Sequence, residues 1–203
     1  MDEIAGWDGR NGPSLYWSIL RPWVDEHSAH VDWLKAFGER QGSPVPDATT
    51  EDIWDLYSIS RINDFLLQNF QPGNASWHER KAQRFALSLD EYLMFVDALG
   101  LRVVSTTKFT PLLHEIVEVS PTNDTTHPIS LSRELWPALM LGSMIFSRSG
   151  TAVEGGGDHV VKEIAENSTL FWAWLRCNRP ALDLSQGWGS NSQWRTRFRR
   201  DYL

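Results

Sequence analysis

The sequence predicts an α+β fold in which a mainly helical half, residues 12–100, packs on a small, mostly antiparallel sheet from residues 101–203. Apolar residues recur every three or four positions in the first half, which is the period of an amphipathic helix. Short runs rich in β-branched residues and bounded by turn residues follow Gly100 and indicate strands. A chain of 203 residues, 41% of them hydrophobic, can form one domain with a sizeable core. We therefore predict a single α+β domain over residues 1–203.

Two helices are predicted in the first third of the chain. One runs from about Pro22 to Gly38, because proline suits a first helical turn and glycine a helix end. Its predicted buried face is Leu20, Val24, His27, Val31 and Leu34. The second begins with the acidic pair Glu51 and Asp52, which favour the positive end of the helix dipole, and ends before Pro72-Gly73. Its predicted buried face is Ile53, Leu56, Ile59, Ile62, Leu66 and Phe70.

A third helix is predicted from Ser88 to Gly100. Ser88 and Glu91 have the spacing of a capping box, in which each side chain satisfies a free backbone amide of the first turn. Gly100 is typical of a helix end. The predicted buried face is Leu89, Tyr92, Leu93, Val96 and Leu99.

Four strands are predicted, over residues 101–105, 112–119, 129–135 and 142–147. In the second of them Glu115 and Glu118 lie three positions apart, which places them on opposite faces of a regular strand and argues against a paired-carboxylate site. The glycine run 155–157 lacks the spacing of a phosphate-binding loop, so we interpret it as a flexible connection.

Charge is unevenly distributed along the chain. The net charge is −7, but residues 176–203 carry six arginines against two aspartates, so the rest of the chain is strongly acidic. This basic segment interleaves arginines with aromatic residues, a pattern suited to anion or nucleic-acid binding. Alternatively, the segment folds back on its own acidic body, and the overall acidity makes nucleic acid the less favoured partner. The residues concerned are Trp194, Arg195, Arg197, Phe198, Arg199, Arg200 and Tyr202.

Composition also indicates a cytoplasmic location. The start of the sequence is acidic and has no apolar segment typical of a signal peptide. No run of about 18 apolar residues is present, so we expect no membrane association. The single cysteine, Cys177, cannot form an intrachain disulfide, which fits a reducing compartment.

Eleven tryptophans make the chain unusually rich in side chains that pack cores or anchor contacts, and two of them flank a glycine-rich and polar turn near the end. Gly187 and Gly189 permit unusual backbone angles there, and the polar side chains offer hydrogen bonds between two indole rings. The turn is a candidate ligand- or partner-binding site, although closure of the end of the domain by the two indoles is the favoured interpretation. Its candidate residues are Trp188, Ser190, Asn191, Gln193, Trp194 and Arg195.

Histidines supply an alternative, metal-dependent site. His27 and His30 lie three apart on the first predicted helix, so their rings can share one face. With a third ligand from His114, Glu115 or His159 they could hold zinc or another divalent metal, which would activate water for a hydrolytic reaction. The chain lacks the H-E-x-x-H spacing and the G-x-S-x-G motif, so neither a zinc protease helix nor a serine nucleophile is indicated.

The segments His114–Val119, Arg133–Pro137, Gly187–Thr196 and Phe198–Tyr202 resemble a group of uncharacterised bacterial proteins that share a GWGSNSQWRT…FRRDY-like ending. The resemblance covers roughly the C-terminal half. It implies a bacterial cytoplasmic origin and transfers no activity, cofactor or catalytic residue.

These observations favour a binding protein without catalytic activity or cofactor. An acidic body attracts a basic protein, and tryptophans supply contact anchors, a combination that would suit neutralisation of a basic protein such as a toxin. The alternatives are the metal-dependent hydrolase and an anion- or nucleic-acid-binding tail.

Overall fold

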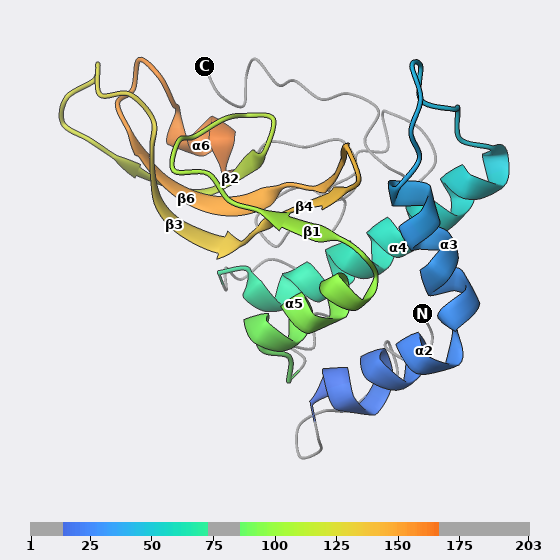
Figure 1. Cartoon of the computed structure of the whole chain (residues 1–203). Helices are drawn as coiled ribbons and strands as arrows, with labels where there is room; N and C mark the ends of the chain where they lie inside the picture. The colour runs from blue at the N-terminus through green and yellow to red at the C-terminus, as the bar shows by residue number, and fades with distance from the viewer. Residues whose placement is uncertain (1–13, 73–85, 167–203) are drawn as a thin grey trace, which may run out of the picture. The chain divides into compact units, whose positions relative to one another are not determined.

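The computed structural model describes residues 14–72 and 86–166 (Figure 1). Helices occupy the first part of these residues and strands the second, which confirms the α+β fold. The described residues form two compact units. The first comprises residues 14–69, 86–104 and 139–147, and the second residues 70–72, 105–138 and 148–166. The assignment of residues 1–203 to one domain stays a prediction.

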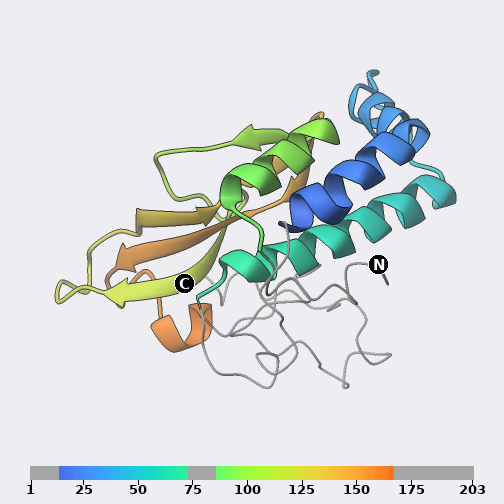
Figure 2. The same cartoon turned by 90° about the horizontal axis from the view of Figure 1, so that it is seen from below.

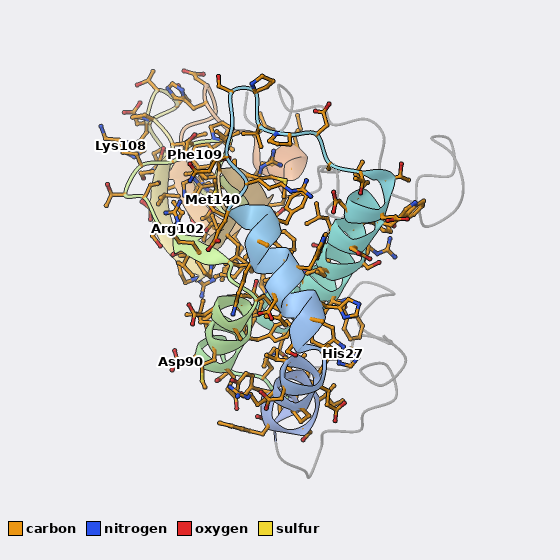
Figure 3. The ribbon with its side chains drawn as sticks, turned by 45° about the vertical axis from the view of Figure 1, so that its right-hand side comes forward. His27, Asp90, Arg102, Lys108, Phe109 and Met140 are labelled. Atoms are coloured by element: carbon orange, nitrogen blue, oxygen red, sulfur yellow. The ribbon has the colours of Figure 1, made fainter. Side chains whose placement is uncertain are left out.

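The helices of the first unit follow the predicted order with one interruption. The helix predicted from Pro22 to Gly38 is broken at His27, whose backbone angles (φ −111°, ψ 38°) leave the helical region. The break separates α2 from α3 at His27, which is labelled in Figure 3. The helical elements are η1 (Tyr16–Leu20), α2 (Arg21–Glu26), α3 (Ser28–Gly38), α4 (Thr50–Leu67), η2 (Gln68–Phe70) and α5 (Leu89–Ala98).

Capping boxes start two of the helices, α4 and α5. The predicted box at Ser88 and Glu91 opens α5 and is confirmed. Glu91 also accepts a hydrogen bond of 2.5 Å from Ser14 Oγ, which ties the start of α5 to the segment before η1. A second box, which the sequence analysis did not identify, joins Thr49 and Asp52 at the start of α4.

The buried face of α4 differs from the predicted apolar stripe. Leu66 is buried as expected, but Ile53 is 54% exposed. The burial of Asn63 and Asp64 explains part of the difference, because the Tyr92 hydroxyl of α5 donates a 2.7 Å hydrogen bond to Asn63 Oδ1. A polar contact between helices therefore takes the place of apolar packing on this side of α4.

A three-stranded sheet completes the first unit, with β4 (Ala138–Leu141) between β1 (Arg102–Val104) and β5 (Met144–Ser147). β4 and β5 run antiparallel through a turn at Gly142, which has a φ of 58°. A Cβ atom at Gly142 would collide with the backbone carbonyl of Gly38 at the end of α3. Glycine is therefore required at this turn both for its backbone angle and for the close approach.

The second unit is built on another three-stranded sheet, with β6 (Ser149–Gly155) between β2 (His114–Pro121) and β3 (Ser130–Trp136). β6 runs parallel to β2 and antiparallel to β3. The short helix α6 (Lys162–Ala165) packs against β2 (Figure 2). The core of the unit consists of Ile116, Val119, Val153, Val160 and Ala165.

The sequence analysis missed β4 and β6. β6 is the central strand, yet its sequence SGTAVEG contains two glycines and only two β-branched residues. Gly150 has a packing reason, because a Cβ atom there would collide with the fully buried ring of Trp136. Tertiary packing thus outweighs the weak local preference for a strand.

The glycine run that begins with the last residue of β6 forms a defined turn, which corrects its interpretation as a flexible connection. Gly155 and Gly156 are buried, and the Gly156 amide donates a 2.8 Å hydrogen bond to the His127 carbonyl. A Cβ atom at Gly156 would collide with the carbonyl oxygens of Asp124 and Thr125. This glycine lets two loops of the second unit come into backbone contact.

In the described ranges, no helix combines the length and the hydropathy that a membrane crossing requires.

Candidate interaction surface

The terminal turn predicted as a binding site lies outside the described residues. This applies to every residue proposed there, and the arginine-rich segment that surrounds the turn lies outside as well. Their assignment stays a prediction. The residues are Trp188, Ser190, Asn191, Gln193, Trp194 and Arg195.

Two of the three predicted metal ligands are neighbours. The rings of His27 and His30 lie 6.0 Å apart between centroids, as their spacing predicted. His27 Nδ1 lies 3.0 Å from the carbonyl oxygen of Trp23, and the two rings of these residues stack at 4.9 Å. One His27 nitrogen is therefore engaged in holding the break between α2 and α3.

His114 is a core residue of the second unit. It is 3% exposed and stacks on Phe109 with 5.6 Å between ring centroids. The Thr110 amide lies 3.0 Å from its Nδ1 in hydrogen-bond geometry. Catalytic zinc sites use three protein ligands and an open position. Residues 14–72 and 86–166 contain no group of three or more His, Cys, Asp or Glu residues that could hold an ion.

The relation between Glu115 and Glu118 corrects the sequence analysis. A bulge in β2 inserts Val117, so that Glu115 pairs with Gly150 and Glu118 with Ala152. These partners lie two apart on β6, which places both carboxylates on one face of the sheet. Glu115 is buried, whereas Glu118 forms a 2.6 Å ion pair with Arg133 across the sheet. The bulge overturns the alternation argument, and the ion pair accounts for Glu118.

Acidic side chains dominate the described part of the chain, with 20 Asp and Glu residues against nine Lys and Arg residues. From α2 to α4 the ratio is nine to four. Two of these four basic residues already have carboxylate partners, Arg21 with Asp25 and Arg40 with Asp52. The surplus carboxylates give this region a negative surface that attracts positively charged molecules.

A polar network centred on Asp52 fixes the start of α4. Asp52 accepts hydrogen bonds from the Thr49 amide at 2.8 Å and from Arg40 Nη2 at 3.0 Å. Trp33 of α3 donates to its other oxygen at 3.2 Å. The amide of Thr49 is the main cause that lowers the pKa of Asp52, and Arg40 adds to it against the opposing effect of burial. The network joins α3, the following loop and α4.

Next to this network, large apolar side chains of α4 lie on the surface. Ile53 is 54% exposed and Trp54 63% exposed. Glu51 and Asp55 are also exposed, and neither forms an ion pair with any residue that the structure describes. Trp54 contacts Tyr57 edge to face, with 6.2 Å between ring centroids. We call Glu51, Ile53, Trp54 and Asp55 the α4 surface.

The sequence analysis did not identify the α4 surface, and it placed Ile53 on the buried face. Periodicity reports where apolar residues recur, but it does not show where the neighbouring helix ends. A usable signal was present in Thr49-Thr50-Glu51-Asp52, because a cap fixes the start of a helix and hence the residues of its first turn.

Comparison of the chain with protein-family models, with curated proteins and with solved structures finds no match.

Proposed function

We propose that the protein is a non-catalytic binding protein of the bacterial cytoplasm whose partner is a basic protein, and that the α4 surface contacts it. The observation that carries the proposal is the exposure of Ile53 and Trp54 at the start of α4, where Glu51 and Asp55 are also exposed and have no ion-pair partners in the described residues. Neutralisation of a basic toxin is one form that this function could take.

The chemistry of the α4 surface fits such a partner. Buried tryptophans are frequent anchors of protein interfaces, because one side chain removes a large apolar area from water. Carboxylates around the anchor steer a basic partner toward it and disfavour acidic ones. The Asp52 network holds the backbone of this surface in place, which lowers the entropy that binding would cost.

The experiment is capture of proteins from the bacterial host with the purified full chain, followed by affinity measurements on the purified partner at several salt concentrations. We expect a basic partner whose affinity falls as salt rises. The double charge reversal Glu51→Lys and Asp55→Lys should weaken binding at least tenfold.

The matched control reverses two exposed carboxylates elsewhere, Asp97→Lys on α5 and Glu154→Lys on β6, which changes the net charge equally. Equal losses in both double variants would show that only net charge matters and would refute the α4 surface. An acidic partner would refute the proposed class of partner. Stoichiometric zinc that is lost in His27→Ala with His30→Ala, together with hydrolytic turnover, would favour the metal-dependent alternative.

A further inference from the structure

We propose that the α4 surface recognises an arginine side chain, with the guanidinium group stacked on the Trp54 indole and hydrogen-bonded to Glu51, while Asp55 adds negative charge beside Glu51. This inference rests on the proposed function and specifies the chemical group of the partner that the surface binds.

The protein shows the same arrangement within its own fold. The Arg40 guanidinium lies over the Phe37 ring, with 4.2 Å from its central carbon to the ring centroid. The same guanidinium donates to Asp52 Oδ2 at 3.0 Å. An aromatic ring of α3 and a carboxylate of α4 therefore together hold one arginine of the loop that follows α3.

A second arginine of the chain lies on an aromatic ring of α4 itself. Arg61 stacks over Tyr57 at 5.4 Å from the ring centroid and donates a 2.6 Å hydrogen bond to the Tyr57 hydroxyl. Tyr57 in turn contacts Trp54. The ladder Arg61, Tyr57, Trp54 thus ends in an indole that is 63% exposed, and a further guanidinium would extend it.

Helix geometry places one carboxylate beside this indole. Glu51 precedes Trp54 by three positions, so the two side chains are neighbours on the helix surface. Glu51 and Asp55 are four apart, and two like charges at this spacing destabilise a helix slightly. A cation bound between them would remove this repulsion.

Arginine suits this surface better than lysine. Its guanidinium is planar, so it can stack on an indole while its N–H groups point sideways to a carboxylate. A lysine ammonium is a strongly hydrated point charge that gains less from the aromatic face. Discrimination between arginine and lysine therefore reports on Trp54, whereas attraction of either cation reports on the carboxylates.

The test compares two blocked peptides of equal length and charge, hexa-arginine and hexa-lysine, titrated into the full chain at low salt with NMR detection. We expect hexa-arginine to bind about threefold to fivefold more tightly, as a cation–π contact at an exposed site predicts. Trp54→Leu should bring this ratio close to one. Glu51→Gln with Asp55→Asn should weaken both peptides and preserve the ratio.

Trp17→Leu is the matched control, because Trp17 is a comparably exposed tryptophan on η1 at 58%. It should leave both affinities and their ratio unchanged. Equal affinities of the two peptides for the wild-type chain, with both weakened in Glu51→Gln/Asp55→Asn, would overturn the arginine inference and leave the proposed function standing. Equal effects of Trp54→Leu and Trp17→Leu would overturn it too. Affinities that do not respond to Glu51→Gln/Asp55→Asn would overturn both proposals.

Discussion

In the sheet of the second unit, side chains bond to a strand edge and cover a glycine backbone, whereas at the start of α4 two large apolar side chains stay exposed. At the edge of β2, Glu166 accepts a 2.8 Å hydrogen bond from the Val119 amide, and Lys162 donates a 2.9 Å hydrogen bond to the Val119 carbonyl. In the middle of the sheet, Trp136 covers the bare backbone of Gly150. At α4, by contrast, Ile53 and Trp54 remain on the surface beside a fully bonded Asp52.

Large apolar side chains are also exposed elsewhere, since Trp17 is 58% and Leu112 62% exposed, but at the start of α4 they accompany exposed carboxylates that have no ion-pair partner among the described residues. The chain uses a side chain of α6, Lys162, and the residue that follows the helix, Glu166, to satisfy a strand edge, a device that also prevents unwanted strand pairing. The same chain fixes the backbone of α4 with three partners on one carboxylate. The combination of Ile53 and Trp54 with the carboxylates of Glu51 and Asp55, unpaired within the described ranges, is the feature from which we infer a basic partner.

The largest loss of stability is expected from substitution of Trp136, the tryptophan buried in the second unit. Trp136 is 0% exposed, and its indole N–H donates a 2.9 Å hydrogen bond to the Arg148 carbonyl. Trp136→Ala should lower the free energy of unfolding by about 3–5 kcal/mol, because it removes a large buried side chain and leaves a cavity. Chemical denaturation measures this loss. A cost below about 1 kcal/mol would contradict the packing of Trp136 on Gly150.

The next largest loss of stability is expected at one glycine of the second unit, Gly150, and not at another, Gly157. Gly150→Ala should destabilise the protein by about 1–3 kcal/mol, because the added methyl group collides with the Trp136 ring. The control is Gly157→Ala, since a Cβ atom at Gly157 has no neighbour within 4 Å. Thermal unfolding of the two variants should show a clear loss for the first and little change for the second. Equal melting temperatures would argue against the close approach in the sheet.

Low pH should destabilise the start of α4, because Asp52 becomes protonated. The pKa of Asp52 is lowered in the folded state, mainly by the Thr49 amide, so the Asp52 carboxylate binds a proton more readily in the unfolded chain. The contribution to stability is therefore present above the ordinary pKa of aspartate, about 3.9, and is lost as the pH falls through the lower folded value. Asp52→Asn should lower stability at neutral pH and flatten its decline in acid.

Asp25→Asn is the control for this acid titration. Asp25 pairs with Arg21 on the surface of α2, at 54% side-chain exposure. Exposed pairs of this kind contribute little to stability, so this variant should follow the wild-type pH curve. An Asp52→Asn curve that also follows the wild type would contradict the role of the network.

The fold follows from the sequence where local signals and burial agree. The Ser88–Glu91 box fixes the start of α5, and Tyr92 and Val96 lie on its buried face as their spacing predicts. The break at His27 was missed because α2 and α3 share one apolar period across it. Strand β6 was missed because glycine is a weak strand former. Gly150 is required by its close contact with Trp136, which lies 14 positions away in the sequence.

The candidate site was less accessible to sequence reasoning. The terminal turn around Trp188 drew attention through composition alone, and it lies outside the described residues. His27, His30 and His114 were grouped as a hypothetical metal site by residue type, but His114 belongs to the core of the second unit. Trp54 was not singled out, because exposure depends on which other elements cover a helix, and one sequence does not contain that information.

The most direct test of the α4 surface compares Trp54→Ala with the wild type in two measurements on the same preparation, thermal unfolding and affinity for the purified partner. We predict a melting temperature within experimental error of the wild type, because the side chain is mostly exposed, and a loss of affinity of about tenfold or more. An unchanged affinity, or a fall in melting temperature as large as that of Trp136→Ala, would contradict the assignment of Trp54 to a partner.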